Sequence, residues 1–186
     1  MKKYIILVFF ILISGIISAL SSSDIWRPMW MPFILPMFLP GLVFGILTGI
    51  YFRKFNGLKT NNIIWYVALS TLAYFSAFNV ARYLHIATTS FGDGSNASLN
   101  GDLIHFVIAG GTGALMLAFG VSYLIRKMKI WQLVSVVLIG GVLGIIFQKT
   151  LIPEFITWWK PQSAILAFIL WQLGVGLALA LFIDRK

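Results

Sequence analysis

The sequence predicts an all-α integral membrane protein, a six-helix transmembrane bundle that forms a single polytopic domain over residues 1–186. Two features of the composition support this fold class, since 60% of the residues are hydrophobic and only 10% are charged. A water-soluble domain normally has about a quarter of its residues charged, so this chain has too few polar residues to cover a soluble surface. The third feature is an uneven distribution of lysine and arginine between successive loops.

Six apolar stretches are each long enough to cross about 30 Å of hydrocarbon as a helix, allowing for tilt. Helices are expected because an open sheet would leave backbone hydrogen-bonding groups unpaired in lipid. The predicted spans are residues 4–20, 31–52, 62–85, 103–125, 130–152 and 162–183.

The charges of the connecting segments predict how the bundle is oriented. Segments on one side carry ten basic residues against one acidic residue, Asp184, whereas the other side carries four of each. Basic residues concentrate on the cytoplasmic side of membrane proteins, so we expect both termini in the cytoplasm and a location in the plasma or inner membrane of the cell. This topology accounts for the basic excess, and we expect no nucleic-acid partner. The ten basic residues are Lys2, Lys3, Arg53, Lys54, Lys59, Arg126, Lys127, Lys129, Arg185 and Lys186.

The first two spans each admit two interpretations. Lys2 and Lys3 followed by an apolar run resemble a secretory signal peptide, but Ile17 is a poor residue before a cleavage site, which favours a retained helix.

The second span begins with prolines at every fourth position, residues 28, 32, 36 and 40. Because proline lacks an N–H and clashes with the carbonyl four residues earlier, we expect residues 28–40 to be irregular or strongly kinked in the outer leaflet. The alternative is a bent helix.

Small residues recur at helical spacing, most clearly as Gly41, Gly45 and Gly49 in the second span. Glycines at this spacing allow another helix to approach closely. The pattern favours packing within the chain. A homo-oligomer or a membrane partner subunit docked on the glycine faces is the alternative.

Six polar or ionisable residues are candidates for a substrate-binding site, because such residues at membrane depth are costly and usually functional. Five lie toward the predicted outer side of spans three to five, and the sixth lies near the middle of span six. This asymmetry predicts a cavity that opens outward, lined by spans three to six and roofed by the proline segment. The candidates are Asn79, Arg82, Asp102, His105, Lys149 and Gln172.

These side chains fit more than one chemistry. Arg82, Lys149 and Gln172 are suited to a small polar or anionic solute, together with His105, whose tautomer Asp102 would fix. Asp102 and His105 also fit an acid–base pair of a membrane enzyme, but no nucleophile motif accompanies them, so enzymatic activity is not favoured. The two histidines do not form a closely spaced metal-ligand pair, and we expect no metal or other cofactor.

Two partial resemblances accompany this pattern. Six spans, inside termini, an irregular outer segment and an outward cavity resemble the substrate-binding S-components of energy-coupling factor vitamin transporters, which implies solute binding. The run Asp102-Leu-Ile-His105-Phe106 is similar to the Asp-x-x-His-Phe signature of VanZ-like membrane proteins. We assign the chain to neither family on these features.

The favoured hypothesis is a multi-pass membrane protein that binds or transports a small solute through the outward-facing cavity, with the lipid bilayer as its solvent. The alternative is an accessory or assembly subunit of a larger membrane complex. A membrane-embedded enzyme that uses Asp102 and His105 is the third hypothesis.

Overall fold

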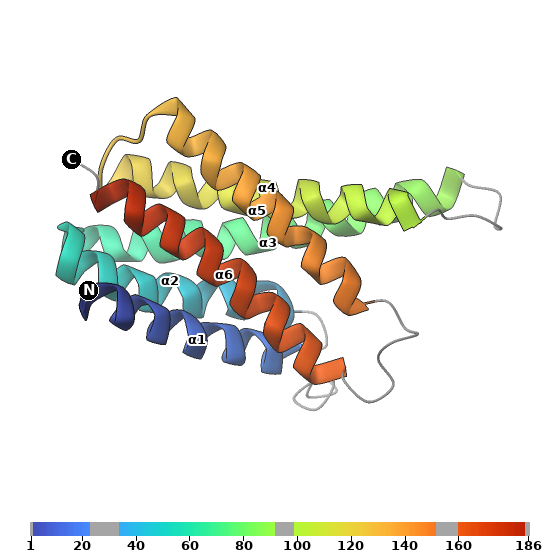
Figure 1. The fold of residues 1–186 in the computed structure, drawn as a ribbon, viewed down its shortest axis with the longest axis horizontal. Helices are drawn as coiled ribbons and strands as arrows, with labels where there is room; N and C mark the ends of the chain where they lie inside the picture. The colour runs from blue at the N-terminus through green and yellow to red at the C-terminus, as the bar shows by residue number, and fades with distance from the viewer. Residues whose placement is uncertain (1, 23–33, 92–98, 152–159, 185–186) are drawn as a thin grey trace.

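The structure, a computed structural model, describes residues 2–22, 34–91, 99–151 and 160–184 (Figure 1). These residues form helices only, with no strand in the described ranges, which confirms the predicted all-helical fold. The helices are α1 (Lys2–Ser22), α2 (Ile34–Asn56), α3 (Thr60–Phe91), α4 (Leu99–Leu124), α5 (Ile130–Leu151) and α6 (Lys160–Asp184).

Five helices, α1, α2, α3, α4 and α6, are long and apolar enough to cross a membrane, and the described apolar stretch of α5, Ile130–Ile146, is shorter. Large apolar side chains are exposed along all six helices. In water such surfaces would be costly, whereas lipid is their natural solvent, so the helices are suited to contact with a bilayer. Examples, one from each helix in order, are Ile5, Leu42, Ile64, Phe119, Ile130 and Leu166.

The helices form a closed ring in sequence order. Each helix packs against its neighbours along the chain, and α6 packs against α1. Figure 1 shows both termini at one end of the bundle, which we call the basic end because it carries the predicted cytoplasmic lysines and arginines. At the other end, which we call the opposite end, α3 and α4 extend beyond the remaining helices (Figure 1).

Several helices differ from the predicted spans at the opposite end. Helix α2 begins at Ile34, so residues 34–40 of the predicted irregular segment are helical, while residues 28–33 lie outside the described residues. Pro36 stands in the first turn, where the missing N–H breaks no helical bond, and only Pro40 lies deeper in the helix. Helix α3 continues to Phe91 and α4 begins at Leu99, because hydropathy marks only the part of a helix that matches the hydrocarbon.

The apolar core of the described residues fills the half of the ring near the basic end. Aromatic rings form much of it: Phe52 meets Tyr66 edge to face at 5.6 Å between centroids, and Tyr51 meets Phe52 at 5.5 Å. Toward the opposite end the buried cluster reaches Phe44 on α2 and Trp171 on α6. Farther toward the opposite end, Ala19, Ala109 and Ala167 are also buried.

Glycines allow the closest helix approaches. A Cβ atom added to Gly41 of α2 would lie 2.6 Å from the backbone oxygen of Ser70 on α3, and one added to Gly110 of α4 would overlap the carbonyl oxygen of Gly140 on α5. Both neighbours are backbone atoms, which cannot move aside by changing rotamer. At these positions the glycines of the chain pack against other helices of the same chain.

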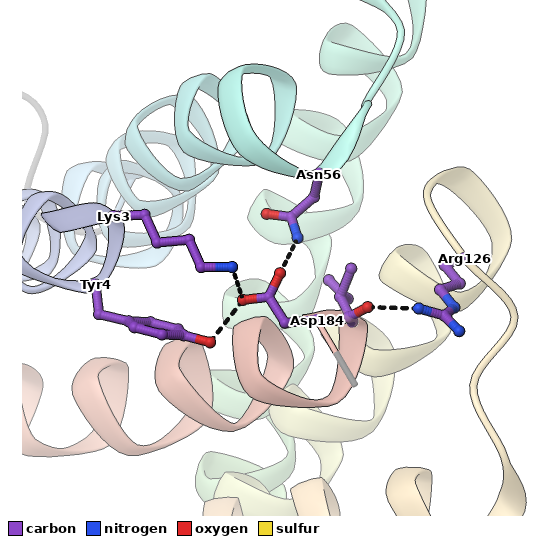
Figure 2. Close-up of polar contacts among 6 residues, drawn as sticks. Lys3, Tyr4, Asn56, Arg126 and Asp184 are labelled. Carbon is purple, nitrogen blue, oxygen red and sulfur yellow. Dashed lines mark hydrogen bonds and ion pairs between the residues drawn. The ribbon is translucent and has the colours of Figure 1, made fainter. Parts of the chain in front are cut away.

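A polar cluster ties the ring together at the basic end (Figure 2). The Asp184 carboxylate at the end of α6 accepts hydrogen bonds from Lys3 Nζ at 2.6 Å and from the Tyr4 hydroxyl at 2.6 Å, both on α1. It also accepts one from Asn56 Nδ2 at 2.9 Å, at the end of α2. This acidic residue therefore joins three helices where the first and last helices of the ring meet.

Candidate functional site

The six candidate residues lie on four adjacent helices of the ring. Asn79 and Arg82 belong to α3, Asp102 and His105 to α4, Lys149 to α5 and Gln172 to α6. For Arg82, Asp102 and Lys149 only the backbone position is described. All but Gln172 lie in the halves of their helices that face the opposite end.

Gln172 is the deepest of the six and is fully buried. Its Nε2 donates a hydrogen bond to Ser18 Oγ on α1 at 3.0 Å, and the Ser18 hydroxyl donates to the backbone oxygen of Ser14 at 2.7 Å. The first helix therefore contributes to this polar region, although the predicted cavity included only spans three to six. Gln172 lies twelve residues from the end of α6, which places it about 18 Å from the basic end at 1.5 Å per residue.

Three buried polar atoms around Gln172 make no hydrogen bond of acceptable geometry within the described residues. They are Gln172 Oε1, the Tyr74 hydroxyl and Ser14 Oγ. The Tyr74 hydroxyl is close enough to the Gln172 side chain to interact with it. A buried polar group without a partner costs about 1–3 kcal/mol in proteins, and there is no bulk water in the bilayer interior to offset that cost. We call Ser14, Ser18, Tyr74 and Gln172 the central polar cluster.

Aromatic side chains lie beside the central polar cluster at the end of the apolar core. Trp171 Nε1 donates a hydrogen bond to the backbone oxygen of Gly140 on α5 at 3.0 Å. The Trp171 ring meets Tyr74 edge to face at 5.2 Å, and Tyr74 meets Phe44 at 6.2 Å. These rings link α2, α3 and α6.

His105 lies farther toward the opposite end than Gln172. Its side chain is 5% exposed. A Cβ added to Gly113 of α4 would contact Trp171 at 3.4 Å, and His105 is eight residues away from Gly113, or about 12 Å along the helix. A solute that contacts both Gln172 and His105 therefore has to span roughly that distance.

The levels of Arg82 and Lys149 along the bundle follow from the antiparallel register of neighbouring helices. On α3, the neighbours of Gly113 are Ala73 and Ala77, so counting eight residues outward brings the α3 backbone to the level of His105 close to Arg82. On α5, Gly144 lies against the Phe106 backbone, which places Lys149 about one turn beyond the level of His105. The backbones of Arg82, His105 and Lys149 therefore lie at neighbouring levels along the bundle, and the backbone of Asp102 lies near the same level.

The Asn79 side chain forms a hydrogen bond within its own helix. Its Nδ2 donates to the backbone oxygen of Phe75 on the same helix at 2.8 Å. The amide is thus bonded to its own helix, and it lies between the levels of Gln172 and His105.

Ser18 and Tyr74 interact with Gln172 but are not among the predicted site residues. The available signal was the spacing of four between Ser14 and Ser18, which places both hydroxyls on one helical face. Among the described residues, no group of three or more His, Cys, Asp or Glu side chains is arranged to hold a metal ion.

Comparison with known proteins adds no family relationship. No protein-family model, no curated protein and no solved structure matches the chain.

Proposed function

We propose that this multi-pass membrane protein binds or transports a small polar or anionic solute through a cavity that opens at the opposite end of the ring. The observation that carries the proposal is the central polar cluster, in which Gln172 Oε1 and the Tyr74 hydroxyl are buried without a hydrogen bond of acceptable geometry. Because lipid offers no partner for such groups, a polar solute or water is the natural occupant.

The distribution of the core supports entry from one end only. The half of the ring near the basic end is filled by apolar and aromatic side chains such as Phe44, Tyr51 and Phe52. The predicted solute-binding residues lie from Gln172 outward. A solute would therefore approach from the opposite end and stop at the apolar core of the basic half, and release on the cytoplasmic side would require this packed half to rearrange.

The chemistry of the two levels suggests how a solute is recognised. At the deeper level, Gln172 Oε1 accepts a hydrogen bond and the Tyr74 hydroxyl donates or accepts one. At the outer level, Arg82, Lys149 and His105 supply positive charge or donors for an anionic group, with Asp102 positioning His105. The separation of about 12 Å between the levels favours an elongated solute with an anionic group at one end and hydrogen-bonding groups at the other.

Native mass spectrometry of the protein extracted in a mild detergent tests the proposal. We expect a reproducible small-molecule adduct on the wild-type chain. In Gln172→Leu, which removes the amide at nearly constant volume, the ratio of bound to free protein should fall about 5- to 10-fold, the effect of one lost hydrogen bond.

Thr48→Val is the matched control, since Thr48 is also buried but lies in the packed half of the ring, where its hydroxyl donates to the Phe44 oxygen, and its adduct should be unchanged. Equal adduct occupancy in wild type and Gln172→Leu would contradict the site assignment. Co-purifying protein subunits without a small-molecule adduct would instead favour the accessory-subunit hypothesis.

A further inference from the structure

A second polar feature lies at the basic end, on the far side of the core from the central polar cluster. A pocket of about 220 Å³ opens where the α4–α5 turn meets the end of α6. Arg126, Lys127 and Lys129 line it together with Trp131 and Phe182. We call this the basic pocket, and we propose that it binds the phosphate headgroup of an anionic phospholipid.

The charge of the basic pocket is uncompensated within the described chain. Among the described residues no carboxylate lines it, and Asp184, the acidic residue at this end of the described chain, is engaged by Lys3, Tyr4 and Asn56. The described residues contain a single ion pair, that of Lys3 with Asp184. The three pocket cations are therefore available to an external anion.

The backbone around the basic pocket is arranged so that it does not repel an anion. The last carbonyls of a helix carry partial negative charge. At the end of α6 this charge is offset, because Arg126 donates a hydrogen bond to the Ile183 oxygen at 2.8 Å (Figure 2). Gln132 Nε2 lies 3.4 Å from the Phe182 oxygen. The first turn of α5 begins at the pocket with Ile130, and the N-terminus of a helix favours phosphate groups.

The surroundings of the basic pocket point to a lipid as the source of the phosphate. Trp131 is 50% exposed and lies edge to face on Phe182 at 5.3 Å, and tryptophan prefers the boundary between headgroups and acyl chains. Ile130, between the lining residues Lys129 and Trp131 in the sequence, is 80% exposed, and Val134, one turn along α5, is 50% exposed. An acyl chain can lie along this apolar surface while the headgroup occupies the pocket, as in basic pockets between transmembrane helices that bind anionic lipids.

Titration with dioleoyl phosphatidylglycerol in detergent, followed by native mass spectrometry, tests the assignment. A basic residue near an anionic headgroup contributes about a fivefold factor in affinity, so the double variant Lys127→Gln/Lys129→Gln should bind this lipid roughly 25-fold more weakly. The control Arg53→Gln/Lys54→Gln removes the same charge from exposed positions at the end of α2, outside the pocket. It should change the affinity by less than about twofold. Elution as a single species confirms that each variant is folded.

Three outcomes would overturn the proposal. An equal loss of affinity in both double variants would show that only the total charge of the basic end matters. Equal binding of dioleoyl phosphatidylcholine would show that the site does not select an anionic headgroup. Saturable binding of sodium phosphate alone, lost in the Lys127→Gln/Lys129→Gln variant, would assign the pocket to free phosphate rather than to a lipid.

Discussion

The seam between α4 and α5 provides a sharp test of the packing, because two adjacent glycines should respond in opposite ways to one substitution. A Cβ added to Gly110 would overlap the Gly140 carbonyl oxygen and lie 3.0 Å from Gly144 Cα. At Gly111 the nearest atom would be Val137 Cγ1 at 3.6 Å, an ordinary contact. Alanine at position 110 must push two backbones apart, whereas alanine at position 111 fits the existing space.

The size of the effect follows from two opposing terms. Overpacking a well-filled interface costs about 1–3 kcal/mol, and the upper part of that range applies to Gly110 because its obstacles are backbone atoms. Replacing glycine by alanine inside a helix returns about 1 kcal/mol. We therefore expect Gly110→Ala to destabilise the fold by about 2 kcal/mol and Gly111→Ala to be neutral or to stabilise it by up to about 1 kcal/mol.

Thermal unfolding in detergent, followed by circular dichroism at the helical band, measures this difference. For a chain of this length about 1 kcal/mol shifts the midpoint by roughly 2–4 °C, so the two variants should differ by roughly 4–12 °C. A Gly110→Ala midpoint equal to or above that of Gly111→Ala would refute the close backbone contact between α4 and α5.

Two further predictions concern polar groups at different depths. Asp184→Ala should lower the free energy of unfolding by about 1–2 kcal/mol through loss of the hydrogen bonds from Tyr4 and Asn56. The partly exposed pair with Lys3 adds little because solvent screens it, and a large loss of stability that disappears in high salt would contradict this division. Tyr74→Phe removes a buried hydroxyl that lacks a good partner, so the thermal midpoint of the ligand-free protein should stay unchanged or rise, while occupancy of the bound solute should fall. A lower midpoint of the ligand-free variant would show that the hydroxyl is already satisfied.

Hydropathy and charge predict the number of helices and where most of them end at the basic side. Predicted spans ended at residues 125 and 183, and α4 and α6 end at Leu124 and Asp184. These ends are marked by clusters of lysine and arginine, which stay at the membrane surface. The ends at the opposite side are less predictable because no such charge cluster marks them, and α3 continues through the polar residues Thr88 and Thr89 to Phe91.

The candidate site is only partly predictable from the sequence, because a serine side chain can serve either close helix packing or hydrogen bonding. In a membrane helix Ser14 and Ser18 permit close packing and also form hydrogen bonds, and the choice depends on the neighbouring helix. That neighbour is α6, which lies 154 residues away in the sequence at the Ser18–Gln172 contact. Hydropathy contains no information on which helices close the ring, so Gln172 was predicted as a site residue without its partner.

The unpaired polar atoms of the described residues lie at two different depths in the bundle. Tyr51 and Asn56 also have buried oxygen atoms without hydrogen bonds among the described residues, but both lie in the last two turns of α2, where interfacial water is near. Gln172 lies deeper, about 18 Å from the basic end of the bundle. The Gln172 amide that donates to Ser18 also carries Oε1, and the Tyr74 hydroxyl lies within reach of that side chain. A cluster that only fixes the contact between α1 and α6 would leave Oε1 to the Tyr74 hydroxyl, whereas under the proposed function an occupant from the opposite end would bind both groups. The thermal midpoint of ligand-free Tyr74→Phe distinguishes the two, because only the first arrangement loses a hydrogen bond in that variant.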